Sequence, residues 1–389
     1  MQILNTKYGE IKIYAKTIEN EAISQIIQMA NSPLAENANL RIMPDAHAGA
    51  GCVIGTTMKV TDKICPNLVG VDIGCGVDLV ETNLDFSVCF ERLDEVIREK
   101  IPYGLNVHSS MREYLPFRAM RCWEKLEKDT QFKAMCSLGT LGGGNHFIEA
   151  YEGGWIAVHS GSRNIGYRVA KYYQDLAEQR MKEMVKEQNR KLLEEVAPLE
   201  RERWLQTFKM QGVPRELSYL TGADMEDYLH DIGILQQFAV ENRSTMLYTI
   251  VKEMNGRIIN SICSTHNYID LEDMTLRKGA IRAHYGEELV IPLNMRDGML
   301  ICEGKGNEDW NCSAPHGAGR LYSRSEAKKT FTVEEYRESM KGIFSTCINE
   351  STLDEAPFVY KDFEEIVDCI EPTVRIKERI RPIYNFKAN

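Results

Sequence analysis

Residues 138–149 read LGTLGGGNHFIE, a glycine run followed at once by an Asn–His pair. Three consecutive glycines, 142–144, can expose backbone N–H groups toward an anion such as a phosphate, although a glycine run also occurs in flexible turns. The same association recurs elsewhere, because most of the 28 glycines lie in the windows 49–76, 139–166 and 298–319. Five of the eight histidines lie inside or close beside such polar, glycine-rich segments. The pattern predicts a functional site built from several loops.

The composition is that of a globular protein with an acidic balance of charge. The 389 residues carry a formal net charge of −10 at pH 7, and 43% of them are hydrophobic. This charge excludes proteins that hold nucleic acid by bulk positive charge. No apolar run approaches the ~20 residues of a membrane helix, and the first residues lack the apolar core of a secretory leader. The eleven cysteines include no C-x-x-C pair, which indicates reduced thiols and a cytoplasmic protein.

Strand-like and helical segments are intermixed along the chain, and glycine-rich loops lie on both sides of a densely charged helical region. No repeat or linker separates them. The sequence therefore predicts an α+β protein with one large domain over 1–389, mixed sheets around a central site, and a charged helical insert at about 168–255. The expected elements are a hairpin over 3–16, strands over 52–60, 68–74 and 77–82, and helices over 17–33, 168–205 (divided at Pro198) and 224–255.

Metal-ligand side chains stand beside glycines in several motifs. In VGVDIGCG (69–76), Asp72 and Cys75 are three residues apart in a glycine-bounded turn, and both bind metals once deprotonated. His146 follows the glycine run, while His159 and His266 end strand-like segments. Taken alone, Asp72 with Cys75 and also His266 fit a turn or a core position better, whereas the glycine run with His146 and the His159 motif after it favour a functional role. Together they form a mixed O, S and N set larger than one tetrahedral zinc uses, which favours two metal ions that share the thiolate.

A further histidine lies in SAPHGAGR (313–320). His316 is followed by two glycines and Arg320. Glycine leaves room for a phosphate and a guanidinium neutralises it, so this loop suits a nucleophile that receives a phosphoryl or nucleotidyl group. A turn with a polar tip is the alternative interpretation. Arg163, in VHSGSR (158–163), is a second candidate for binding a phosphate.

The other histidines carry weaker signals. His108, His230 and His284 have mixed surroundings and are interpreted as structural. His47 lies in MPDAHAGAG (43–51), where either a structural or a functional role fits. Together with Asp45, it could hold a metal ligand in position without itself binding the metal.

Seven motifs together resemble one known family. They are MPDAHAGAGCVIGTT (43–57), VGVDIGCG, GGGNHFIE (142–149), VHSGSR, the His–Asn pair of STHNYI, HGAGR (316–320) and the terminal YNFK (384–387). Their identity and order are similar to those of the RtcB-type RNA ligases, over residues 43 to 387. The resemblance implies that family's own α+β architecture. This architecture is unrelated to that of ligases that use an adenylated lysine, and their K-x-D-G motif has no counterpart in this sequence.

The resemblance implies an RNA ligase that uses GTP and two Mn²⁺ ions in RNA repair or tRNA splicing. It would join RNA 3′-phosphate or 2′,3′-cyclic phosphate ends to 5′-hydroxyl ends. His316 would be the catalytic nucleophile, which carries GMP and passes it to the RNA 3′ end. The implied metal ligands are Asp72, Cys75 (bridging), His146, His159 and His266. The implied nucleotide contacts are Asn145, His146, Phe147, Ile148, Glu149, His266, Asn267, Pro292, Leu293, Asn294, Met295, Met299, His316, Gly317, Ala318, Gly319, Arg320 and Lys387.

Two positions depart from the family pattern. Residues 292–295 read PLNM where many members have P-G-S-M, and Met299 stands where a serine often helps to hold the nucleotide. Both changes bear on the choice of nucleotide. RNA contact is expected from local basic segments, 277–282 and 371–389, for which an ordinary solvated surface is the alternative interpretation. The resemblance also raises an archease-like or release-factor-like accessory protein as a partner.

Two other functions stay open. A metal-dependent phosphodiesterase acting on RNA 2′,3′-cyclic phosphate ends would use the same metals, but it would need neither a covalent histidine nor Lys387. An RNA-end-binding or metal-storage protein with a degenerate site is the third interpretation. The presence of every ligand position and of His316 argues against it.

Overall fold

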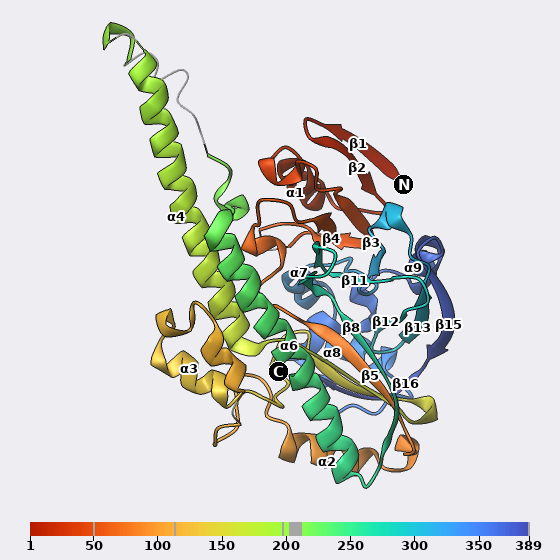
Figure 1. Ribbon diagram of the computed structural model, residues 1–389. Coiled ribbons are helices and arrows are strands. Elements are labelled where there is room, and N and C mark those ends of the chain that lie inside the picture. The colour runs from red at the N-terminus through yellow and green to blue at the C-terminus, as the bar shows by residue number, and fades with distance from the viewer. Residues whose placement is uncertain (50, 113, 197, 202–211, 388–389) are drawn as a thin grey trace.

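The computed structural model describes residues 1–49, 51–112, 114–196, 198–201 and 212–387 (Figure 1). Within these residues the strands form four sheets, and the helices pack around them. The predicted α+β class is confirmed. The two longest helices, α4 (Arg163–Glu195) and α6 (Gly222–Glu253), contact each other, and one end of α4 projects beyond the sheets (Figure 1).

The N-terminal sheet has the order β1-β2-β3-β4-β10-β9. Its first two strands form the predicted hairpin, and the helix that follows is α1 (Asn20–Ala30). Ala22, Ile26 and Met29 recur on one face of α1 at helical spacing and are buried in the core. The strands are β1 (Gln2–Thr6), β2 (Gly9–Ile13), β3 (Arg41–His47), β4 (Ile54–Lys59), β9 (Asn267–Asp270) and β10 (Thr275–Lys278).

The central sheet is antiparallel and has the order β16-β6-β7-β5-β8. Its strands are β5 (Gly76–Thr82), β6 (Phe147–Tyr151), β7 (Trp155–Ser160), β8 (Ile258–Thr265) and β16 (Pro382–Lys387). Phe147 and Val77 both pair with His159, and Gly76 pairs with Thr265. Because of this register, the residues just before β5 and β6, at the end of β7 and just after β8 meet at one end of the sheet.

One predicted strand is wrong. Val69, Val71 and Ile73 alternate with other residues, which is typical of a strand, but the chain instead forms a 3₁₀ turn (Pro66–Leu68) followed by further turns. Gly70 and Gly74 adopt positive φ values of 98° and 73°, far from the φ of about −120° to −140° of a regular strand. The two glycines of this motif thus bend the chain and place Asp72 in a loop instead of a sheet.

Two smaller sheets complete the framework. One has the order β12-β13-β15, with β12 (Glu288–Asn294), β13 (Gly298–Gly304) and β15 (Val374–Ile380), and the other pairs β11 (Ala280–Arg282) with β14 (Ser313–Pro315). The altered segment 292–299 comprises the end of β12, the short turn 295–297 and the start of β13, with Pro292 paired opposite Met299. His316 comes directly after β14, and β16 follows β15, which connects this region to the central sheet.

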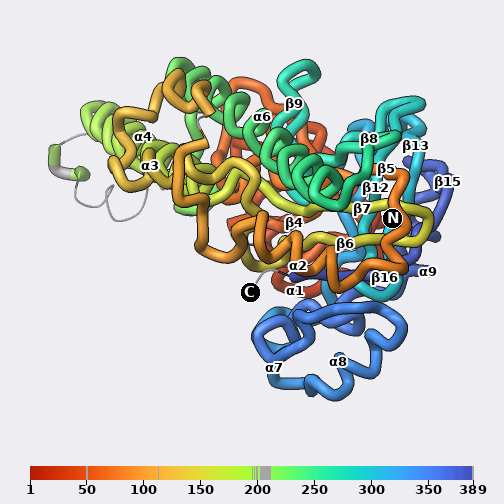
Figure 2. Tube along the Cα trace, turned by 90° about the horizontal axis from the view of Figure 1, so that it is seen from below, coloured from red at the N-terminus to blue at the C-terminus, as the bar shows by residue number. Residues whose placement is uncertain are grey.

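The shorter helices are α2 (Phe90–Lys100), α3 (Lys128–Met135), α7 (Arg324–Thr330), α8 (Val333–Ser339) and α9 (Phe363–Ile370). Helices α7 and α8 begin with capping boxes, and Figure 2 shows them on a different side of the molecule from α4. Helix α4 begins five residues earlier than predicted and ends before Pro198, which starts a 3₁₀ turn. The rest of the predicted helix, from residue 202, lies outside the described residues. None of the helices in the described ranges is long and apolar enough to cross a membrane.

Two neighbouring residues of α6 fix the loops at the end of the central sheet. Arg243 is fully buried; its Nε pairs with Asp78 Oδ1 at 2.7 Å, and its Nη1 donates to the carbonyls of Gly74 and Ser160 at 2.8 and 3.0 Å. Asn242 Oδ1 accepts the backbone N–H of Gly139 at 2.8 Å. A buried ion pair of this kind loses about 3–5 kcal/mol when one partner is removed. Helix α6 therefore holds three glycine-containing motifs in one place.

Candidate functional site

A cavity of about 850 Å³ opens where the sheets meet. Its walls contain most of the residues that the sequence motifs single out: Asp72, Cys75, Asn145, Phe147, Glu149, His159, His266, Asn267, Pro292, Leu293, Asn294, Met295, His316, Gly317, Ala318, Gly319, Arg320 and Lys387. His146 lies next to this wall, in contact with Asp72 and Cys75. The side chains of Ile148 and Met299 instead pack in apolar clusters of the core.

Five candidate metal ligands converge around Cys75. The donor atoms of Asp72, Cys75 and His146 lie within 4.8 Å of one another, and so do those of Cys75, His159 and His266. Cys75 Sγ is 3.6 Å from His146 Nε2 and 3.3 Å from His159 Nε2. Asp72 Oδ2 is 3.0 Å from His146 Nε2, and the Nε2 atoms of His159 and His266 are 3.3 Å apart. The structure thus forms two donor groups that share one sulfur.

Hydrogen bonds on the far side of the rings fix how two of the histidines present their nitrogens. His146 Nδ1 lies 2.7 Å from the carbonyl oxygen of Leu141, and His159 Nδ1 lies 3.1 Å from that of Asn145. A carbonyl oxygen only accepts, so each Nδ1 carries the proton and donates it. Each Nε2 then offers its lone pair to the centre of the group, as in metal-binding histidines with an oriented ring.

Burial determines the charge of this group in the protein alone. It raises the pKa of the Cys75 thiol well above its ordinary value, and Asp72 raises it further. Burial also lowers the pKa of His159 and His266 well below the ordinary value. The imidazoles of His159 and His266 are therefore neutral and able to bind a cation, while the thiolate needs a nearby cation to form. The donor set fits a pair of divalent first-row metal ions, although thiolate softness by itself favours zinc over manganese.

Two glycines are required for this close packing. A Cβ on Gly142, whose φ is 90°, would lie 1.9 Å from Arg163 Nη1 and 2.8 Å from His146 Nδ1. A Cβ on Gly161 would lie 2.3 Å from Asp72 Oδ1. Arg163, expected from the sequence to bind a phosphate, instead uses its Nε on Thr140 Oγ1 at 2.8 Å and its Nη2 on a backbone carbonyl. The glycines therefore admit side chains that support the metal-ligand candidates.

His316 is held by a buried carboxylate. Asp45 Oδ2 lies 2.7 Å from His316 Nδ1, and it also accepts the backbone N–H of His316 at 3.2 Å. Asp45 is fully buried. The carboxylate keeps the proton on Nδ1, which leaves the lone pair on Nε2. The ring of His316 lies 4.9 Å, centroid to centroid, from that of His266, so the histidine pair joins the candidate nucleophile to the candidate metal centre.

The sequence did not identify the residue that Asp45 orients. His47 and Asp45 were expected together to orient another ligand, and His47 Nδ1 lies 3.0 Å from the backbone oxygen of Asp45. The side chain of Asp45 contacts His316. Since these two residues are far apart in the chain and belong to separate motifs, their spacing carries no signal of the contact.

A buried glutamate that the motifs do not reveal connects two cations of the cavity wall. Glu355 lies 3.1 Å from Lys387 Nζ and 3.2 Å from Arg320 Nη1, and it accepts the hydroxyl of Tyr360 at 2.6 Å. Burial alone would raise the pKa of Glu355, but Lys387 and Arg320 outweigh it and lower the pKa from 4.5 to about 2. The glutamate is therefore ionised and fixes both cations in place.

Replacement of Glu355 by glutamine is expected to destabilise the protein at pH 7 by about 3 kcal/mol, the equivalent of the pKa shift. Because the pKa is lower in the folded state, the carboxylate stabilises the fold above pH 4.5, and this contribution is lost as the pH falls toward 2. The free energy of unfolding in urea, measured at pH 7 and pH 3, should differ between wild type and variant mainly at pH 7. The exposed Glu350→Gln is the control. An equal loss at both pH values would contradict the ion-pair account.

The basic segments proposed to contact RNA are largely occupied within the protein. In 277–282, Arg277 and Lys278 are buried, so the expectation that they form a surface patch is wrong. In 371–389, Arg375 pairs with Glu303 at 2.8 Å, and Lys377 pairs with Glu288 at the same distance. Lys387 faces the cavity, where Glu355 binds it. A basic run in a sequence does not show which of its Lys and Arg side chains are buried or paired with acidic residues in the folded protein.

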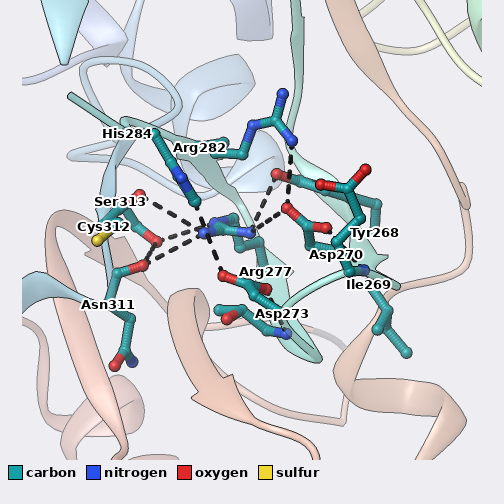
Figure 3. A network of polar contacts seen from close by, with 12 residues as sticks. Tyr268, Ile269, Asp270, Asp273, Arg277, Arg282, His284, Asn311, Cys312 and Ser313 are labelled. Carbon is teal, nitrogen blue, oxygen red and sulfur yellow. Dashed lines mark hydrogen bonds and ion pairs between the residues drawn. The ribbon is translucent and has the colours of Figure 1, made fainter. Parts of the chain in front are cut away.

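Arg277 belongs to a polar network outside the cavity (Figure 3). Its Nε donates to Ser313 Oγ at 2.9 Å, and its Nη1 lies 3.6 Å from Asp270 Oδ2. Asp270, Asp273 and His284 bring three donor atoms together here. However, Arg282 also pairs with Asp270, and Lys59 Nζ lies 3.4 Å from Asp273. Since these cations already neutralise both carboxylates, the group fits a structural network better than a metal site.

Comparison with known proteins agrees with this arrangement. The family model described as "tRNA-splicing ligase RtcB" matches residues 25–388. The chain is 30% identical to the RNA-splicing ligase RtcB of Escherichia coli strain K12, over 100% of this chain and 99% of that protein. It is 25% identical to the tRNA-splicing ligase RtcB of Nanoarchaeum equitans, over 98% and 94% of the two chains. The chain belongs to the RtcB family of RNA-splicing ligases.

Proposed function

We propose that this chain is a GTP- and Mn²⁺-dependent RNA ligase. It joins RNA 3′-phosphate or 2′,3′-cyclic phosphate ends to 5′-hydroxyl ends through a GMP adduct on His316, in RNA repair or tRNA splicing. The observation that carries the proposal is the position of His316. A buried carboxylate holds its Nδ1, and its ring adjoins His266 on the wall of one cavity with both candidate metal groups.

In the first step, the lone pair of His316 Nε2 attacks the α-phosphorus of GTP. A P–N bond forms, the bond to the pyrophosphate oxygen breaks, and pyrophosphate leaves. A 3′-phosphate oxygen of the RNA then takes the GMP group from the histidine. Finally the 5′-hydroxyl attacks the activated 3′-phosphate, a phosphodiester bond forms, and GMP leaves. A 2′,3′-cyclic end must first be opened by water.

The metal ions would be held by Asp72, Cys75 and His146 on one side and by Cys75, His159 and His266 on the other. They would offset the negative charge of the phosphates. The choice of manganese comes from the family resemblance. Nothing in the softness of the ligands selects it over zinc.

The nucleotide would occupy the cavity beside His316. Arg320 and Lys387 lie on its wall, where Glu355 fixes them and so limits the directions in which they can donate. Asn145, Phe147, Glu149, Asn267 and the loop 316–320 line the same space. The proposal that RNA is the substrate follows from the family to which the chain belongs. We further propose that the protein acts in the cytoplasm, where its eleven free cysteines stay reduced, with an archease-like or release-factor-like partner.

The proposal is tested by incubating the full-length protein with GTP and MnCl₂ and measuring its intact mass. A GMP adduct, mapped by peptide sequencing to His316, supports the ligase. Protein that opens RNA 2′,3′-cyclic phosphates without any adduct would indicate the phosphodiesterase. Protein that forms no adduct and changes no RNA end would indicate a binding protein instead.

A further inference from the structure

Two consecutive residues just before β14 have an unusual backbone. Asn311 and Cys312 adopt φ values of 52° and 46°, and in the described ranges they are the only adjacent non-glycine residues with positive φ. A side chain crowds the backbone in this left-handed region, and asparagine tolerates the region better than cysteine does. Such a conformation persists only where the surrounding structure holds it. His316 follows this pair closely in the chain, so whatever holds the pair also bears on the position of the candidate nucleophile.

The buried side chain of Arg277 holds this pair (Figure 3). Its Nη2 donates to the carbonyl oxygen of Asn311 at 3.2 Å and to that of Cys312 at 3.5 Å. Its Nε donates to Ser313 Oγ at 2.9 Å, and this hydroxyl in turn donates to the carbonyl of Asn311 at 2.8 Å. A guanidinium presents its donors in a rigid planar fork, so one side chain can fix two neighbouring carbonyls and a hydroxyl together.

The other side of the guanidinium is anchored on β9. Its Nη1 donates to the hydroxyl oxygen of Tyr268 at 3.1 Å and lies 3.6 Å from Asp270 Oδ2. Both residues belong to β9, whose first residue, Asn267, directly follows His266. Arg277 therefore connects the strand that follows a candidate metal ligand to the segment that precedes the candidate nucleophile.

The backbone beyond Arg277 connects the same two places. The N–H of Ala280 donates to the carbonyl oxygen of His266 at 3.2 Å. Ala280 also pairs with Pro315 in the ladder between β11 and β14, and His316 follows Pro315 directly. The end of β14 thus holds His316 beside His266, while Arg277 fixes the backbone at the start of β14.

We propose that Arg277 is a positioning residue for the candidate nucleophile. It keeps the backbone of residues 311–312 in the left-handed conformation, and this conformation holds His316 against Asp45 and beside the candidate metal centre. Arg277 is fully buried and lies outside the described walls of the cavity, so it acts through β14 and not on the substrate. The inference rests on the proposed function for the reaction of His316, whereas the position of His316 can be measured without GTP.

Arg277→Lys tests the fork while it keeps the charge. A lysine ammonium cannot bind both carbonyls, the Ser313 hydroxyl and the β9 side chains at once. Asp270 keeps a partner in this variant, because Arg282 Nη1 lies 3.4 Å from it. The rate of GMP-adduct formation, followed by intact mass, should fall by about 10- to 100-fold through misplacement of His316. Bound metal and the affinity for the α,β-methylene analogue of GTP, which cannot release pyrophosphate, should stay as in wild type.

A second substitution separates positioning from a general loss of stability. Glycine adopts positive φ without strain, so adding Cys312→Gly to Arg277→Lys should raise the adduct rate again by about tenfold. Cys312→Gly alone should react at nearly the wild-type rate. The matched control adds Asn255→Gly to Arg277→Lys, because Asn255 also has positive φ, at 58°, but is exposed at the end of α6. This control should leave the reduced rate unchanged.

Proton NMR follows the position of His316 in the full-length protein with Zn²⁺, which is diamagnetic, in place of Mn²⁺. The Nδ1 proton held by Asp45 should give a downfield resonance that is absent in His316→Ala. The resonance should weaken in Arg277→Lys and return when Cys312→Gly is added.

Three results would overturn the inference: a wild-type adduct rate in Arg277→Lys, a reduced rate with an unchanged resonance, or equal recovery with Cys312→Gly and Asn255→Gly. Absence of any adduct in wild type would refute the proposed function instead. The resonance would then still decide whether Arg277 positions His316.

Discussion

Replacement of Cys75 by alanine is expected to reduce bound metal from two ions to less than one and to lower RNA ligation by at least about 10³-fold. The sulfur is the one atom that both donor groups share. Without it, Asp72 and His146 remain on one side and His159 and His266 on the other, two donors each, which is too few for a stable site. Metal content after dialysis against MnCl₂, measured by mass spectrometry, reports the loss independently of catalysis.

The control is Cys136→Ala, which removes another buried free thiol. This variant should keep its metal and its activity. Both proteins should show wild-type circular dichroism, because the core clusters described for this chain do not depend on the Cys75 sulfur. Two ions retained by Cys75→Ala would rule out a bridging thiolate and would require separate ligand sets.

Local spacing was sufficient to find the candidate ligands, because each motif places a donor beside the glycines that its close packing needs. Asp72 and Cys75 are three residues apart on a turn, and both reach the same point, as their spacing suggested. The glycines at 142 and 161 leave space for Arg163 and Asp72. A sequence records such short-range requirements directly, since a larger residue at either position would clash.

Long-range pairing could not be predicted in this way. Asp45 and His316, and likewise Glu355 and Lys387, are brought together only by the packing of separate elements, while Glu149 and Asn385 meet through the register of β6 and β16. Nothing in the spacing of one motif identifies its partner in another. The structural environment of an aspartate or an asparagine becomes visible only once the strands are paired.

Charge and strand patterns were misleading for a related reason. The basic run at 277–282 resembles an RNA-binding patch, but β10 is an inner strand of its sheet and buries Arg277 and Lys278. The apolar alternation at 68–74 resembles a strand, but glycines with positive φ bend it. In both segments the tertiary setting outweighs the local preference.

His316→Ala is expected to abolish the GMP adduct, because the variant lacks the proposed nucleophile. The contribution of Asp45 to the reactivity of His316 can be measured separately, in variants that keep the histidine. In Asp45→Asn the side-chain amide can donate to His316 Nδ1, so the ring is held with its proton on Nε2 and cannot attack. The rate of adduct formation should fall by about 10²- to 10⁴-fold, as when an amide replaces the carboxylate of a catalytic Asp–His pair.

Asp45→Ala distinguishes this effect from a loss of packing. It removes the acceptor without adding a donor, so His316 can still adopt the reactive tautomer for part of the time. Adduct formation, followed by intact mass over minutes to hours with GTP and MnCl₂, should therefore be slower than in wild type but faster than in Asp45→Asn. The reverse order would mean that Asp45 acts through packing alone. The expected order would show that the buried carboxylate sets the proton position on the nucleophile, a role that depends on the 2.7 Å contact between Asp45 Oδ2 and His316 Nδ1.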